Sequence, residues 1–181
     1  MIKFSRVALG AALLAVAGIA SAATATVTVS AHDNSLYGPT GTGVDGLDTG
    51  LTVNGGEFIT FSTSGSWNNS SPDTSYISGA GGHDGFVGDA HPNFDFDQFG
   101  LNAPFGSLVG KIGDGAYFEI GDSFTGYANA SGDLKLFYWD SDFANNSGSV
   151  TVQVSAVPEP MNIALMGLAL GAFALSRRRK A

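Results

Sequence analysis

Short apolar runs separated by Gly, Ser and Asn recur along the middle of this 181-residue chain. Within these runs apolar and polar residues alternate, as in 149–154, where the valines would point inward and Thr151 and Gln153 outward. Alternation with a period of two is typical of a half-buried strand. No stretch between the two chain ends keeps helical periodicity for as many as three turns. The pattern therefore predicts an all-β protein.

Several segments have this strand character, and turns such as Asn54-Gly55-Gly56 and 129–132 join them. The predicted strands are 24–30, 50–53, 57–63, 107–112, 116–120, 133–139 and 149–154. Short strands at such spacing favour a β-sandwich or jelly roll.

A long segment rich in Gly, Asn and Asp, 64–105, has little strand character. Loops of that length are usually functional or mobile. The glycine-rich run 79–85 could suggest a phosphate-binding loop, but neither a lysine nor a helical pattern follows it, which argues against that interpretation. We expect a flexible loop tip there.

The N-terminal segment 1–22 has a basic start (Lys3, Arg6), an apolar run and the small-residue sequence Ala20-Ser21-Ala22. This order is that of a secretory signal peptide cleaved after Ala22. The alternative is an N-terminal membrane anchor, but the apolar run is shorter than the roughly 20 residues that span a bilayer.

At the C-terminus, the sequence Val157-Pro158-Glu159-Pro160 precedes an apolar segment, 161–175, and a basic cluster, 177–180. The whole of 157–181 resembles the PEP-CTERM sorting signal of Gram-negative bacteria that produce exopolysaccharide. The resemblance implies a membrane-anchored precursor in the inner membrane, processing by an exosortase, and a final place at the cell surface or in the extracellular matrix. The basic cluster would stay cytoplasmic. A plain C-terminal anchor is the alternative.

Removing both ends leaves 23–156, which is one domain's worth of chain. This segment holds fifteen acidic residues against Lys111 and Lys135, a formal net charge of −13. Such a surface repels nucleic acid and attracts cations. The chain has no cysteine, which excludes disulfides, thiol catalysis and cysteine zinc sites.

The loop between the last two predicted strands concentrates oxygen ligands, namely Asp140, Asp142, Asn145 and Asn146. Ca²⁺ takes roughly 6 to 8 oxygens from carboxylates, amides, backbone carbonyls and water. The same residue types also close an ordinary loop by bonding their own backbone. The sequence alone leaves both interpretations open.

Five segments, taken in chain order, carry a family resemblance: 48–53 (DTGLTV), 58–67 (FITFSTSGSW), 106–113 (GSLVGKIG), 132–140 (GDLKLFYWD) and 145–149 (NNSGS). They resemble the PA-IL-like bacterial lectins, which are small calcium-dependent galactose binders. The resemblance implies a jelly-roll, galactose-binding-like β-sandwich. It also implies a Ca²⁺ cofactor bridged to two sugar hydroxyls.

Carried over residue by residue, the resemblance implies calcium ligands from the side chains of Asp140, Asn145 and Asn146 and from a backbone carbonyl near Asp142. A further carbonyl, near Ser70, would complete the set.

The family's sugar-contacting His-Pro pair resembles His91-Pro92. The family's glutamine three positions later is Phe94 here, so Gln98 is the nearest candidate for the second sugar contact. Asp140 and Asn145 would face both metal and sugar. The bland alternatives are a loop histidine without a ligand and, for Trp67, a core position rather than a sugar platform.

These observations favour a secreted, surface-sorted protein that binds a carbohydrate, of galactose type or an exopolysaccharide, through calcium. The alternative is a structural matrix protein whose calcium only stabilises the fold. Catalysis is not expected, since no nucleophile triad or metal-hydrolase pattern is present. A homo-oligomer stays open, because the related lectin gains avidity from several subunits.

Overall fold

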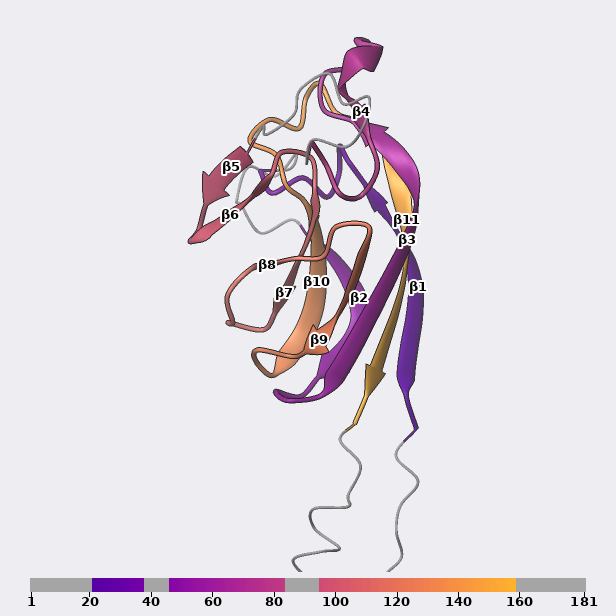
Figure 1. The fold of residues 1–181 in the computed structure, drawn as a ribbon, viewed down its shortest axis with the longest axis vertical. Helices are drawn as coiled ribbons and strands as arrows, with labels where there is room; N and C mark the ends of the chain where they lie inside the picture. Colours follow the sequence, from indigo (N-terminus) through magenta and orange to yellow (C-terminus); the bar gives the residue numbers. More distant parts are fainter. Residues whose placement is uncertain (1–20, 38–45, 84–94, 159–181) are drawn as a thin grey trace, which may run out of the picture. The chain divides into compact units, whose positions relative to one another are not determined.

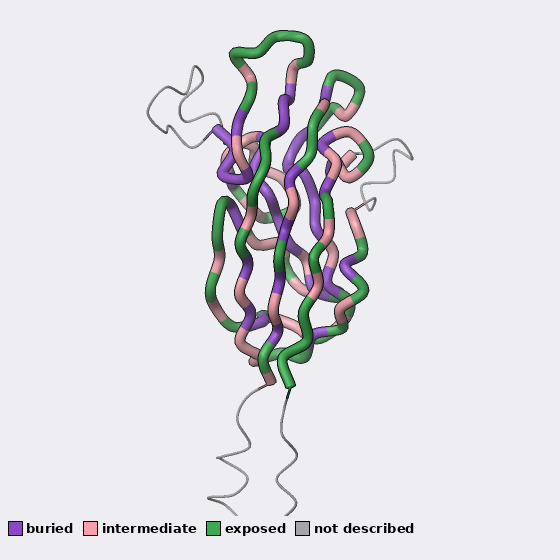
Figure 2. The backbone as a smooth tube through the Cα atoms, turned by 90° about the vertical axis from the view of Figure 1, so that its right-hand side faces the viewer, coloured by how far each residue is buried: buried purple, intermediate pink, exposed green. Residues whose placement is uncertain are grey.

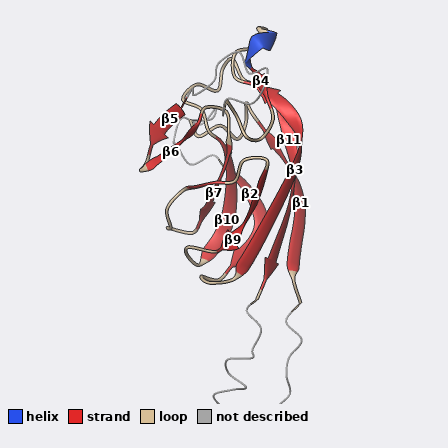
Figure 3. Ribbon diagram, in the orientation of Figure 1, coloured by secondary structure: helices blue, strands red, loops and turns tan. Residues whose placement is uncertain are grey.

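The computed structural model describes residues 21–37, 46–83 and 95–158, which form one unit. Two antiparallel sheets and a separate hairpin make up this unit (Figure 1). Within the described residues the helical structure is one short 3-10 turn, Thr74–Tyr76, drawn in blue in Figure 3. No helix in these ranges is long and apolar enough to cross a membrane. The prediction of an all-β sandwich is confirmed.

The first sheet is built around the long final strand, β11. Its order is β1-β11-β3-β4, and β9 pairs with the earlier part of β3. The strands are β1 (Ala23–Ser30), β3 (Phe58–Asn68), β4 (Ile77–Ser78), β9 (Ser123–Tyr127) and β11 (Ser147–Val157). β11 pairs with β3 along its whole length, so this pair forms the spine of the sheet.

The second sheet has the order β2-β10-β7-β8. Its strands are β2 (Leu47–Val53), β7 (Leu108–Ile112), β8 (Phe118–Glu119) and β10 (Gly132–Tyr138). A separate hairpin joins β5 (Asp95–Gln98) to β6 (Leu101–Pro104).

Apolar side chains fill two clusters, one on each side of the second sheet. The larger lies between the sheets and includes the inward valines of β11, Val150, Val152 and Val154, as the alternation predicts. Buried and exposed positions alternate along the strands that face the viewer in Figure 2. The smaller cluster is Leu36, Ala103, Val109, Phe137 and Trp139, on the outer face of the second sheet and against the β5–β6 hairpin.

Strand lengths and the long segment 64–105 differ from the prediction. β3 continues to Asn68, and Gly65 allows this because its φ is +114° and the carbonyl oxygen of Ser149 would lie 2.7 Å from an added Cβ. β4, β5, β6 and β9 were not predicted. The predicted flexible tip is wrong for 79–83, since Ala80 and His83 are buried and Leu108 donates its amide to the Ala80 carbonyl.

Candidate functional site

The loop that follows β10 and the segment that follows β3 meet at one end of the sandwich (Figure 1). The register of β3 and β11 ends with Asn68 opposite Ser147. Beyond that pair, the Ser71 amide donates to the Asn145 carbonyl at 2.8 Å. The pairing of β3 with β11 thus places the segment after β3 next to the loop before β11.

Asp140 is the central residue of this end. Its side chain is buried, with only 2% of the residue exposed, and Oδ1 accepts a hydrogen bond from the Asp142 amide at 3.0 Å. Oδ2 has no partner among the described residues. Burial raises the pKa of Asp140 to about 6, and hydrogen bonds from the Asp142 backbone, the Asn146 side chain and the Ser141 backbone only partly oppose this. An ionised Asp140 is therefore only partly compensated.

Two buried asparagines in the segments that meet at this end also have an unpartnered side-chain oxygen among the described residues. Asn146 donates through Nδ2 to the Ala31 carbonyl at 3.4 Å, but its Oδ1 has no partner in the described part of the chain. The Oδ1 atom of Asn69 is likewise buried and unpartnered there. Asn69 directly follows the Asn68–Ser147 pair, which sets it on the chain segment beside Asn146.

The chemical type of these atoms sets them apart from other buried polar atoms. The unpartnered oxygens at this end are Asn69 Oδ1, Asn146 Oδ1 and Asp140 Oδ2. When Asp140 is ionised, all three can accept a hydrogen bond and none can donate one. Elsewhere among the described residues, the buried Trp67 indole and the hydroxyls of Ser78, Ser107 and Tyr138 also lack partners, but each of these groups can donate. Buried polar groups without partners call for an explanation such as an ion. A set of acceptors alone calls for a cation or a donor.

The other predicted ligands lie at the rim. Asp142 is exposed, its Oδ1 accepts from the Ala144 amide at 3.0 Å, and its charge adds to the raised pKa of Asp140. The side chain of Asn145 is exposed, while its carbonyl is used by Ser71. The Ser70 carbonyl accepts from the Asp73 amide at 2.8 Å, which leaves one lone pair for a further contact.

This donor set fits calcium better than a transition metal. Among the described residues no group of three His, Cys, Asp or Glu side chains gathers in one place. Calcium does not require such a group, since amide and backbone oxygens serve it as well as carboxylates. We call Asn69, Ser70, Asp140, Asp142, Asn145 and Asn146 the loop cluster.

The predicted sugar contacts divide. His91 lies outside the described residues, as do Pro92 and Phe94. Gln98 stands in β5, where its Nε2 donates to the Tyr37 hydroxyl, and its role as a sugar contact stays a prediction. Trp67 is a core residue, as the bland alternative held: it is 1% exposed and its ring packs edge-on against Tyr138.

Sequence reasoning missed Asn69. The signal that could have found it is its position between Trp67 and Ser70, in the same motif that supplied the predicted backbone ligand. A side chain whose oxygen is buried without a partner is a stronger ligand candidate than an exposed carbonyl already in use.

The sequence matches no protein-family model and none of the curated proteins compared with it. A solved structure described as "EclA N-terminal domain; PllA-like lectin" is similar, with a TM-score of 0.51 at 22% sequence identity. The alignment covers 73% of this chain and 95% of that one. The two share a fold. The predicted β-sandwich fold is therefore also that of a solved structure.

Proposed function

We propose that this chain is a calcium-dependent, carbohydrate-binding protein of the lectin type and that the loop cluster is its binding site. The observation that carries the proposal is the set of buried, unpartnered acceptor oxygens of Asn69, Asp140 and Asn146. The similar solved domain is described as a lectin, which supports the same conclusion.

The roles of the residues follow from their burial. Asp140 supplies the negative charge, and the Asp142 amide, which donates to its Oδ1, helps to fix the carboxylate in place. Asn146 and Asn69 offer amide oxygens from the two chain segments that adjoin the Asn68–Ser147 pair. Asp142, Asn145 and the Ser70 carbonyl, at the exposed rim, would complete the shell and meet the sugar.

When bound, calcium would hold two neighbouring sugar hydroxyls in a fixed geometry and so discriminate between sugars. The rim residues would then orient the ring through hydrogen bonds, with Asn145 and Asp142 as the exposed side chains available for this. The chain binds in this proposal and catalyses nothing.

We also propose that the protein is exported by 1–22 and sorted by 157–181, with an exosortase as the processing partner. Support comes from the sequence: the Pro158-Glu159-Pro160 motif, the apolar segment and the basic cluster occur in the required order. Of the motif, Glu159 and Pro160 lie outside the described residues. Expression in a Gram-negative host should give a surface-exposed, shortened protein, and Glu159→Ala should leave the precursor in the inner membrane. Unchanged processing of that variant would contradict the sorting proposal.

A glycan array probed with the full chain, in calcium and in EDTA, tests the binding proposal. Glycans retained in calcium and lost in EDTA are expected, and Asp140→Asn should abolish retention while the far-UV spectrum stays that of a β-protein. Asn129→Ala, in the turn before β10, is the matched control and should bind normally. A chain that binds calcium but no glycan would favour the structural alternative, in which the metal joins the β3 and β11 loops.

A further inference from the structure

The outer face of the second sheet carries the only two cationic residues between Val7 and Ser176, Lys111 and Lys135. β7 and β10 pair so that Lys111 stands directly opposite Lys135. Side chains directly opposite on neighbouring strands lie on the same face and interact, and like charges there repel. The two lysines of the unit therefore stand next to each other on one face of the sheet, where their charges repel.

Neither lysine is neutralised by the acidic side chains around it. The ion pair found among the described residues joins His32 to Asp33, and neither lysine forms one in those ranges. Asp48, opposite Lys135 on the other neighbouring strand, uses its Oδ1 to accept from the Gly50 amide at 2.8 Å. In a segment of formal charge −13, unpaired lysines are unexpected.

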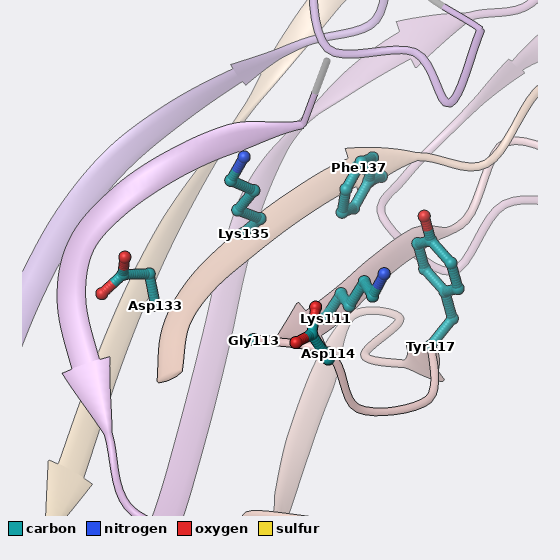
Figure 4. Close-up of a pocket in the computed structure, with 7 residues that line it drawn as sticks. All are labelled: Lys111, Gly113, Asp114, Tyr117, Asp133, Lys135 and Phe137. Carbon is teal, nitrogen blue, oxygen red and sulfur yellow. The ribbon is translucent and has the colours of Figure 1, made fainter. Parts of the chain in front are cut away.

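A cavity of about 270 Å³ opens at this point. Figure 4 shows its lining, with both lysines over the same side of the sheet and Lys111 reaching toward Tyr117. We call it the lysine pocket, and its side chains are Lys111, Asp114, Tyr117, Asp133, Lys135 and Phe137. It lies where the smaller apolar cluster ends, since Phe137 belongs to that cluster and Tyr117 packs on it.

An aromatic shelf borders the pocket. The Lys111 Nζ lies 4.9 Å from the centre of the Tyr117 ring, and Phe99 stacks on Tyr117 at 5.7 Å and 24°. Phe99 occupies the β5–β6 turn with a φ of +50° and leaves 54% of its surface in solvent. A bulky residue in the left-handed region is strained, and strain of this kind persists at ligand sites. A flat apolar surface beside charged groups suits a sugar ring.

The carboxylates of the pocket limit the charge of the ligand. Asp133 accepts from the Thr52 hydroxyl at 2.8 Å, and Asp114 is exposed at the turn after β7. Two carboxylates beside two ammonium groups disfavour a densely sulfated or phosphorylated polymer. They remain able to accept hydrogen bonds from hydroxyls. The pocket therefore fits a ring that bears hydroxyls and a single negative charge.

We propose that the lysine pocket binds a hexuronic acid unit of an acidic polysaccharide, with the sugar carboxylate between Lys111 and Lys135. The ring hydroxyls donate to Asp114 and Asp133, and the apolar edge of the chain rests on Phe99 and Tyr117. This site uses no metal and does not depend on the loop cluster.

Calorimetric titration of the full chain with tri-galacturonate, in EDTA, tests the proposal. Binding is expected with the acid, and binding at least tenfold weaker is expected with its neutral methyl ester. Asp140→Asn should bind the acid as the unchanged chain does, which separates this site from the proposed calcium site. No binding of the acid, or equal binding of acid and ester, would overturn the proposal without using any variant.

Substitutions then locate the site. Lys111→Gln and Lys135→Gln should each weaken binding at least tenfold, while Lys111→Arg and Lys135→Arg should retain it. The double variant Lys135→Gln with Gln153→Lys restores the net charge on the exposed face of the other sheet. It should bind as weakly as Lys135→Gln alone, and recovery would mean that only overall charge matters.

Discussion

The loop cluster and the lysine pocket both contain polar or charged groups without a partner, but of opposite electrostatic character. At the loop cluster, three acceptor oxygens are buried without a donor among the described residues, and the missing component is a cation. At the lysine pocket, two half-exposed lysines stand at opposed strand positions without an ion pair among the described residues, and the missing component is an anion. The first deficit comes from burial and the second from strand register. A candidate binding site can therefore be recognised by polar or charged groups that the surrounding protein leaves uncompensated, whether those groups are negative or positive.

The largest expected effect that separates the two regions is the response of the metal-free protein to pH. Between about pH 4 and pH 6 the folded chain holds a proton on Asp140 that the unfolded chain has released, because burial raises the folded-state pKa from 3.8 to about 6. The free energy of unfolding in EDTA should then fall as pH rises through this window, by about 3 kcal/mol from this group. Urea titrations at several pH values measure it.

The Asp140→Asn variant is the control for the pH effect, since asparagine has nearly the size and shape of aspartate but cannot titrate. The difference between the two stability profiles should show the slope between pH 4 and pH 6, and parallel profiles would contradict it. Lys135→Gln should leave the difference unchanged, because Lys135 is not among the groups that shift the pKa of Asp140.

Calcium should produce the next largest effect. A ligand that binds only the folded state at about 100 times its Kd stabilises it by about 2.7 kcal/mol. For a unit of this size that is roughly 10 °C in Tm. Differential scanning fluorimetry at pH 7 should show the rise with calcium and its loss with EDTA, and Lys135→Gln should behave the same way. An identical Tm in both conditions would rule out the calcium site.

Asn69 gives a smaller and more local prediction. Removal of its amide oxygen in Asn69→Ala should lower calcium affinity roughly tenfold, as expected for a supporting group at a metal site. Asn129→Ala, at a turn that lacks the loop cluster, should have the affinity of the unchanged protein. If calorimetry gives equal affinities for both variants, Asn69 is a structural residue only.

The smallest effect belongs to the lysine pocket without ligand. Lys135→Gln removes one of two like charges at directly opposed positions of β7 and β10, so the free energy of unfolding should rise by roughly 0.5 kcal/mol. Lys135→Arg keeps the repulsion and should leave stability unchanged. A loss of stability in Lys135→Gln would mean that the lysine pair is already compensated in the free protein.

The sequence predicted the parts of the fold that depend on local pattern. β1 and β11 alternate between apolar and polar residues, β10 is a largely apolar run, and the predicted bounds of all three lie within three residues of the observed ones. The β5–β6 hairpin was missed because its residues, such as Asp95 and Asp97, are poor strand formers that pair only through the turn at Phe99-Gly100. Tertiary packing against the smaller apolar cluster overrides their local preference.

The site was predictable in part for the same reason. Asp140, Asp142, Asn145 and Asn146 are neighbours in the chain, so composition alone could mark them. Asn69 joins them only through the pairing of β3 with β11, more than seventy residues apart in sequence. The opposition of Lys111 and Lys135 likewise depends on the register of β7 and β10, which no local pattern specifies.

The pairing of β11 with strands on both sides has a mechanical consequence. The loop cluster precedes Ser147, at the first residue of β11, and the chain leaves the unit after Val157, its last. A pull between a bound ligand and a tether on that end would act along β11, across its ladders to β1 and β3. Hydrogen bonds perpendicular to the strands would then have to shear together rather than open one by one. A force applied in that direction would therefore load the two longest strand pairings of the unit.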